Sequence, residues 1–129
     1  MGSFAFKRQQ RLLNSAEFTS VFNNVEAKIS HNAFLILANR SSELPFPRLG
    51  LIAAKKNLKL AVQRNSFKRI VRESFRCQQD LPAAVNVIVM SRSGAGQISN
   101  AELRAALDNA WRRLVKRLPT LHTEAPPPQ

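Results

Sequence analysis

The sequence has few of the residues on which a disulfide framework, a metal site or side-chain catalysis would depend. Its 129 residues include one cysteine, two histidines and eight acidic residues. The single cysteine, Cys77, cannot form an internal disulfide, so we expect a reducing compartment, namely the cytoplasm. The sequence has no run of about 18 apolar residues that could span a membrane. The N-terminus also lacks a secretory hydrophobic segment, because Lys7 and Arg8 follow directly after Phe6.

The few titratable residues do not form a catalytic or metal-binding pattern. His31 and His122 lie far apart, and no group of His, Cys, Asp and Glu has the spacing of metal ligands. Cys77 has no evident histidine partner, and residues 94–96 (Gly-Ala-Gly) are too short for a phosphate-binding loop and indicate a turn. We therefore expect no catalytic residue and no metal site in the protein itself.

Positive charge, by contrast, is abundant. The chain has 20 Lys and Arg residues, a formal net charge of +12 and a pI near 11.5. Such a charge opposes folding by self-repulsion, and its usual counterpart is a polyanionic partner. Nucleic acid is the leading candidate, and a membrane surface is the second. The apolar fraction of 44% is normal for a globular protein, so we expect one domain with a modest core.

The charge is concentrated in residues 55–76, where Glu73 is the only acid. At about 100° per residue, this segment has an apolar arc on one side of a helix and a cationic arc on the other. The apolar arc consists of Phe67, Ile70, Val71, Ser74 and Phe75. The cations Arg64, Lys68, Arg72 and Arg76 recur at every fourth residue, so they form one line along the helix. This line matches a polyphosphate backbone better than it matches a small anion.

The remaining patterns place this helix in a small α/β protein. Asn14 with Glu17, and Ser99 with Glu102, have the capping-box spacing that begins a helix. We expect, in order, a short helix, strands at 33–39 and 48–54 joined as a hairpin, a basic helix at 58–77, a strand at 85–90 and a last helix before Pro119. The order αββαβα predicts one α/β (α+β) sandwich, a small sheet with helices packed on it, over residues 1–119. Residues 120–129 are expected to be a disordered tail.

Two aromatic residues have two possible roles, and a third is expected in the core. Phe18 and Phe22 are four residues apart, so they share one helix face, and such pairs usually pack in a core. Base stacking on the two rings is the functional alternative. Trp111 lies on the apolar face of the last helix, and we expect it in the core.

The basic segment resembles the signature of the bacterial ribonuclease P protein subunit. The matching residues are Lys55-Lys56, residues 61–65 (AVQRN), Lys68-Arg69, Arg72-Glu73 and Phe75-Arg76. Outside this segment, residues 11–22 resemble the N-terminal helix of the family, and residues 48–51 (RLGL) resemble the strand before the basic helix. The resemblance covers about residues 8–117. One departure is Ser66, which stands where an Arg-Asn-Arg motif has its third member.

The resemblance implies a fold like the second domain of ribosomal protein S5, with a left-handed strand–helix–strand crossover. General fold rules would predict the opposite hand, because about 98% of parallel crossovers are right-handed. The resemblance also implies that catalysis belongs to a partner RNA with bound Mg²⁺. This RNA removes the 5′ leader from precursor tRNA. The protein would be a monomer in a 1:1 ribonucleoprotein.

The family resemblance further implies two sets of binding residues. The catalytic RNA would contact the basic helix and the segment before it through Lys55, Lys59, Arg64, Asn65, Lys68, Arg69, Arg72 and Arg76. The 5′ leader would lie in a cleft between the first helix and the sheet, bordered by Phe18, Phe22, Leu35, Leu37, Ile52, Lys56, Arg64, Asn65 and Arg72. Two alternatives remain at this point. A small ribosomal or ribosome-assembly protein would share the basicity and the fold, whereas a metal-dependent nuclease would need an acidic cluster that the sequence lacks.

Overall fold

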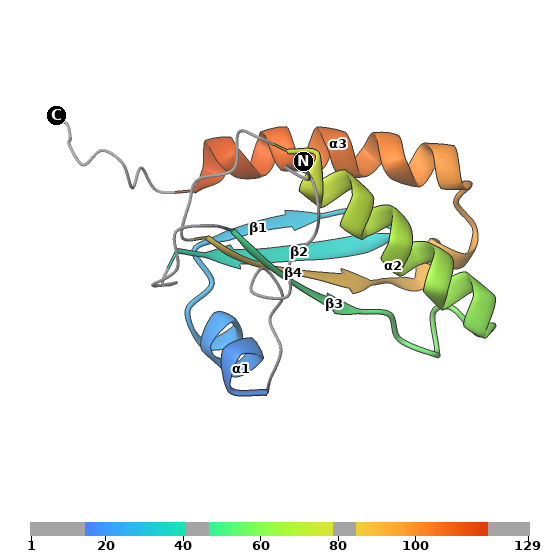
Figure 1. The fold of residues 1–129 in the computed structure, drawn as a ribbon, viewed down its shortest axis with the longest axis horizontal. Coiled ribbons are helices and arrows are strands. Elements are labelled where there is room, and N and C mark those ends of the chain that lie inside the picture. The colour runs from blue at the N-terminus through green and yellow to red at the C-terminus, as the bar shows by residue number, and fades with distance from the viewer. Residues whose placement is uncertain (1–14, 41–46, 79–84, 119–129) are drawn as a thin grey trace, which may run out of the picture.

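The structure is a computed structural model that describes residues 15–40, 47–78 and 85–118. Its elements follow in the order α1 (Ser15–Asn23), β1 (Ala27–Ser30), β2 (Phe34–Asn39), β3 (Arg48–Ile52), α2 (Ala61–Arg76), β4 (Asn86–Ser91), the 3₁₀ helix η2 (Ser93–Gly96) and α3 (Asn100–Arg117) (Figure 1). The predicted α/β class is confirmed. Asn14, with its predicted capping role, and the predicted tail at 120–129 lie outside the described residues.

The four strands form one mixed sheet in the order β1-β2-β4-β3. β1 pairs antiparallel with β2, β2 antiparallel with β4, and β3 parallel with β4. Two sequence predictions are wrong here. β1 was missed, because only Ala27 and Ile29 mark its buried side in a four-residue strand. β2 and β3 do not form a hairpin, because β4 lies between them.

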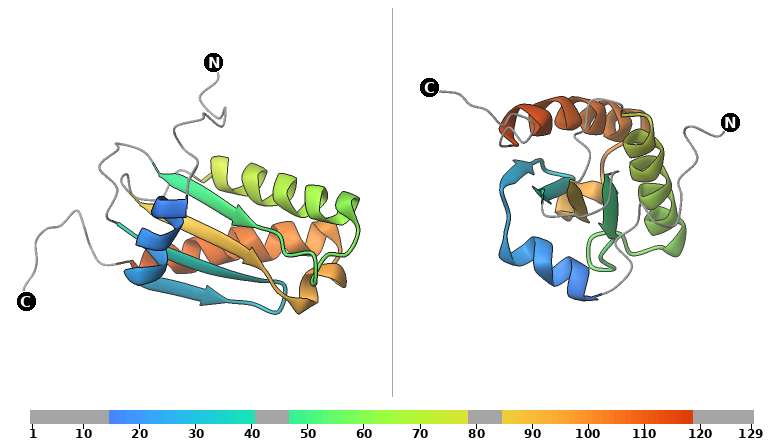
Figure 2. Two further views of the ribbon diagram at one scale, coloured as in Figure 1. Left: turned by 90° about the horizontal axis from the view of Figure 1, so that it is seen from below. Right: turned by 60° about the vertical axis from the view of Figure 1, so that its left-hand side comes forward.

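The crossover from β3 through α2 to β4 has the unusual left hand. Seen from the side that α2 covers, with β3 and β4 pointing upwards, β4 lies to the left of β3 (Figure 2). This agrees with the family resemblance and departs from the rule that about 98% of such crossovers are right-handed. The hand of the crossover decides which sheet face α2 covers, and α2 contacts β3, the edge strand of the sheet.

The main core lies between the sheet and the two long helices. α2 and α3 cover one face of the sheet, and α1 lies on the other (Figure 2). All five residues of the predicted apolar arc of α2 are buried. Trp111 is fully buried, as predicted, and its ring packs edge-on against Phe75 at a centroid distance of 5.7 Å. Burying this arc directs the cations of α2 outwards.

Hydrogen bonds fix the two long helices against each other and define the start of α3. The Trp111 indole donates to the Ser74 hydroxyl at 2.8 Å, and Ser74 donates to Asp108 at 2.6 Å. This buried polar link satisfies groups that would otherwise be costly to bury. α3 begins with the predicted capping box, in which Ser99 accepts from the Glu102 N–H at 3.1 Å and Glu102 accepts from the Ser99 N–H at 3.2 Å.

Candidate nucleic-acid interface

The sheet face that α1 covers carries a second, smaller apolar cluster. Side chains alternate between the two faces of a strand, so Leu35 and Leu37 of β2 face away from the main core. The register places Leu37 beside Ile88, Leu35 beside Met90, and Met90 beside Ile52. Val21 of α1 buries Leu37 and Ile88, while Leu35, Ile52 and Met90 stay partly exposed. α1 therefore covers only part of this face.

Phe18 and Phe22 extend this apolar area from the side of α1. Their rings are stacked, with centroids 6.4 Å apart and planes inclined by 29°. Phe18 is half-buried against the small cluster, and Phe22 is 42% exposed. We call Phe18, Phe22, Leu35, Ile52 and Met90 together the α1 surface. The expectation from spacing alone, that both rings pack in a core, does not hold for Phe22.

An ion pair fixes α1 to the edge of the sheet. A nitrogen of the Arg48 guanidinium, at the start of β3, donates a hydrogen bond to the Glu17 carboxylate of α1. The two side chains are 14% and 26% exposed, so the pair is partly shielded from solvent. This contact joins residues that are 31 positions apart and was not predicted from the sequence. Glu17 directly precedes Phe18, so the pair lies next to the aromatic rings.

The predicted RNA-binding residues lie on α2 and on the segment that leads into it. Lys55, Lys56, Lys59, Asn65, Arg69 and Arg76 are exposed, whereas Arg64, Lys68 and Arg72 are half-buried. The three half-buried residues recur at every fourth position and flank the buried arc on the side away from α3. α2 contacts β3 on that side, and β3 is the edge strand of the sheet. The line of cations therefore follows the β3 edge of the sheet. One face of the same sheet carries the α1 surface.

Arg64 and Arg69 have identified partners within the protein. The Arg64 guanidinium donates to the carbonyls of Leu58 at 2.8 Å and Lys59 at 3.1 Å. It thus holds the segment before α2 in place. Arg69 lies 3.6 Å from the Glu73 carboxylate, in an exposed pair of a kind that contributes little stability. Arg64 therefore orients other candidate contact residues besides presenting its own charge.

The structure adds Met90 to the α1 surface, and the sequence analysis did not single it out. Ile88 lies on the same sheet face as Leu35 and Leu37 but is fully buried. Alternation along β4 could have indicated them, because Val87 and Val89 occupy the positions that face the main core. Their neighbours in the sheet, however, depend on the position of β4 in the strand order, which local patterns did not give.

Within residues 15–40, 47–78 and 85–118, the structure shows no metal-type cluster and no membrane helix. No group of three or more His, Cys, Asp and Glu side chains gathers there in a way that could hold a metal ion. Likewise, none of the helices in these ranges is long and apolar enough to cross a membrane. The chemistry that the described surface offers is apolar contact, ring stacking and positive charge.

These features define a class of protein: a basic α/β fold with a left-handed crossover, a stacked aromatic pair on one sheet face and a cationic helix at the edge of the sheet. Comparison with known proteins specifies the class further. A family model described as Ribonuclease P matches residues 6–115. The chain therefore belongs to the ribonuclease P protein family, as its sequence signature predicted.

Individual relatives agree with this assignment. The ribonuclease P protein component of Saccharophagus degradans is 46% identical over 123 residues, which cover 95% of this chain and 90% of the relative. That of Pseudomonas aeruginosa PAO1 is 43% identical over 126 residues, covering 98% and 91%. The solved RNase P protein of Thermotoga maritima superimposes with a TM-score of 0.68 at 26% identity, covering 80% of this chain and 96% of its own. That of Staphylococcus aureus superimposes with a TM-score of 0.69 at 24% identity, covering 83% and 93%, and shows the same fold.

Proposed function

We propose that this protein is the subunit of ribonuclease P that binds a catalytic RNA through the cations of α2 and holds the 5′ leader of precursor tRNA on the α1 surface. The observation that carries the proposal is the adjacency of the two surfaces. The stacked rings of Phe18 and Phe22 lie at one side of the sheet face, and the line of Arg64, Lys68 and Arg72 follows its β3 edge. Single-stranded RNA can use both features, because its bases stack on aromatic rings and its negative phosphates pair with cations.

Catalysis in this proposal belongs to the RNA. Mg²⁺, which promotes phosphodiester hydrolysis by activating water and stabilising charge, would be held mainly by the RNA and the substrate. The side chains of the described residues agree with this assignment, because they form no cluster of carboxylates that could bind Mg²⁺ and include many cations. The role of the protein is to lower the repulsion between two RNA molecules and to raise affinity for the substrate. One protein would join one RNA, in the cytoplasm, for the processing of tRNA 5′ ends.

Reconstitution tests the proposal directly. The protein alone, rigorously freed of RNA, is expected to leave precursor tRNA intact. The catalytic RNA at low Mg²⁺ is expected to cleave slowly by itself and much faster with the protein present. Cleavage by the RNA-free protein would assign the chemistry to the protein, and no stimulation of the RNA would remove the protein from the reaction. Co-purification with ribosomal subunits in place of this RNA would favour the ribosomal alternative.

A further inference from the structure

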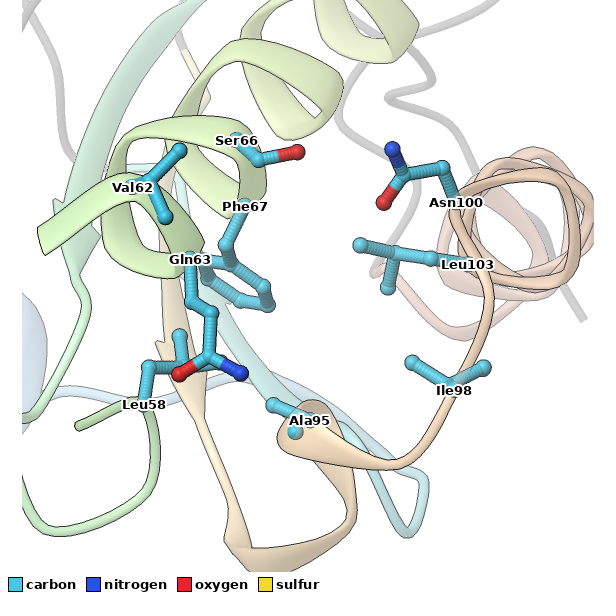
Figure 3. Close-up of a pocket in the computed structure, with 10 residues that line it drawn as sticks. Leu58, Val62, Gln63, Ser66, Phe67, Ala95, Ile98, Asn100 and Leu103 are labelled. Carbon is cyan, nitrogen blue, oxygen red and sulfur yellow. The ribbon is translucent and has the colours of Figure 1, made fainter. Parts of the chain in front are cut away.

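A separate hollow lies between the first turns of α2 and α3 and the short helix η2. It has a volume of about 250 Å³ (Figure 3). Its inner wall is apolar and includes Phe67, Ile98 and Leu103. The volume is below the roughly 300–1,000 Å³ that is typical of drug-sized ligand sites. The hollow therefore suits a single small, flat group better than a peptide.

Polar side chains surround the opening of this hollow. Gln63, Ser66 and Asn100 line it together with the apolar wall. The Gln63 amide oxygen accepts the Leu60 N–H at 3.0 Å, which fixes that side chain and turns its amide nitrogen towards the hollow (Figure 3). The Ser66 hydroxyl and the Asn100 amide lie opposite each other at the opening (Figure 3). Amides and a hydroxyl together supply both donors and acceptors.

The surroundings of the hollow favour a nucleotide over an uncharged ligand. Two helices of 16 and 18 residues begin beside it, and helix N-termini favour negative charge, although the Glu102 carboxylate already occupies the first turn of α3. The exposed Lys59 precedes one of these helices. Val62 at the opening is 68% exposed and nearby Leu60 is 59% exposed, which leaves apolar surface for a partner to cover. The hollow lies on the α3 side of α2, so it is distinct from the cationic line beside β3.

We propose that this hollow binds one unstacked nucleobase of the catalytic RNA. The base would pack its faces against the apolar wall and present its polar edge to Gln63, Ser66 and Asn100. Recognition of unstacked bases in this way is the usual route to specific RNA contacts. The inference rests on the proposed function, and it adds a contact outside the α1 surface and the cations of α2.

Two variants and one control test the inference. Ser66→Phe places a ring in the hollow, and Asn100→Ala removes one polar group from its edge. Asn109→Ala is the matched control, because it removes the same group from an exposed position of the same helix away from the hollow. The probe is the ribonuclease P RNA of the source bacterium. The measurements are the dissociation constant of the protein–RNA complex and the chemical reactivity of the Watson–Crick edge of each base in the RNA.

The wild-type protein is expected to protect the edge of one unpaired base. Ser66→Phe should restore the reactivity of that base and weaken binding about tenfold, within the range for loss of one stacked base. Asn100→Ala should weaken binding less, and Asn109→Ala should leave it unchanged. Thermal unfolding establishes that each variant is folded, and Asn100→Ala, at an exposed position, carries the test if Ser66→Phe does not fold.

An abasic RNA completes the test. Removing the protected base should weaken binding to the wild-type protein about as much as Ser66→Phe does, and should cause no further loss with Ser66→Phe. Independent losses that simply add would overturn the inference, as would unchanged affinity and protection in both variants. In those cases the proposed function stands if the RNA still binds. A wild-type protein that does not bind this RNA would overturn both.

Discussion

At the residue scale, Phe22 shows how exposure separates a binding residue from a core residue on the same short helix. Its neighbour Val21 is fully buried, whereas Phe22 is 42% exposed and stacks on Phe18. A partly exposed aromatic ring contributes less hydrophobic stabilisation than a buried one, because part of its apolar area stays in contact with water. Within one helix turn, Val21 therefore packs in the core, whereas Phe22 exposes its ring to solvent.

This division gives a first prediction. Phe22→Ala should weaken binding of precursor tRNA to the assembled ribonucleoprotein by about 1–3 kcal/mol, the range for one lost stacking contact. Binding of mature tRNA and the melting temperature should change little. Val21→Ala is the control on the same helix and should instead destabilise the fold by about 2 kcal/mol. Equal weakening for both tRNAs, together with a large loss of stability in Phe22→Ala, would make Phe22 a packing residue.

Arg64 and Asn65 give a second residue-scale prediction, because these neighbours differ in their internal contacts. Arg64 holds the carbonyls of Leu58 and Lys59, whereas Asn65 is exposed. Arg64→Ala should weaken binding to the catalytic RNA and also cost about 1 kcal/mol of stability through the lost hydrogen bonds. Asn65→Ala should weaken RNA binding with no shift in the denaturation midpoint. Identical denaturation curves for the two variants would show that the Arg64 contacts add no stability.

At the scale of elements, the position of α1 depends on few contacts. It packs through Val21 on Leu37 and Ile88, and Glu17 pairs with Arg48 of β3. A nine-residue helix is too short to be stable by itself, so these tertiary contacts hold it in place. The ion pair lies at the end of the helix that carries Phe18. Breaking it should therefore loosen the aromatic pair over the sheet.

The corresponding prediction concerns the leader. Glu17→Gln should reduce the gain in affinity that a 5′ leader gives over mature tRNA, while affinity for the catalytic RNA stays the same. The double variant Glu17→Arg with Arg48→Glu should recover part of that gain, because the pair is restored in reverse. Glu26→Gln is the control, since Glu26 lies beyond the C-terminal end of α1 and forms an exposed pair with Arg40 at 3.3 Å. A leader-dependent gain that survives Glu17→Gln unchanged would exclude this positioning role.

Sequence patterns predicted the helices and strands more accurately than they predicted which of these elements lie next to each other. The arc of Phe67, Ile70 and Phe75 was correctly predicted, because an amphipathic helix records its burial in a local period. The place of β4 between β2 and β3 is non-local, so a wrong hairpin was predicted. The left-handed crossover came from the family signature, since steric preference favours the other hand. The Glu17–Arg48 pair has no local signal at all, and the assignment of residues to RNA or leader remains a prediction.

At the scale of the whole molecule, the positions of the cations matter more for binding the leader than the net charge of +12 does. α3 also carries exposed cations, including Arg112, Arg113 and Lys116, but it lies on the sheet face opposite to the α1 surface (Figure 2). Charge on that side acts on a leader bound at the α1 surface only over a distance, and salt screens it beyond about 8 Å at physiological ionic strength. Cations beside the α1 surface act by direct contact with phosphate.

Salt dependence separates these two contributions. Each phosphate contact to a single strand adds a slope of roughly −0.7 to the dependence of log affinity on log salt. Lengthening the leader by a few nucleotides should raise affinity and steepen this slope. Lys56→Ala or Arg72→Ala should flatten it, whereas Arg113→Ala, which removes the same charge from α3, should shift affinity slightly and leave the slope of the leader effect unchanged. Changing leader bases at fixed length should matter less, because phosphate contacts carry no sequence information. A leader effect that ignores salt, or one that Arg113→Ala flattens as much as Arg72→Ala does, would show that overall charge, and not the cations beside β3, attracts the leader.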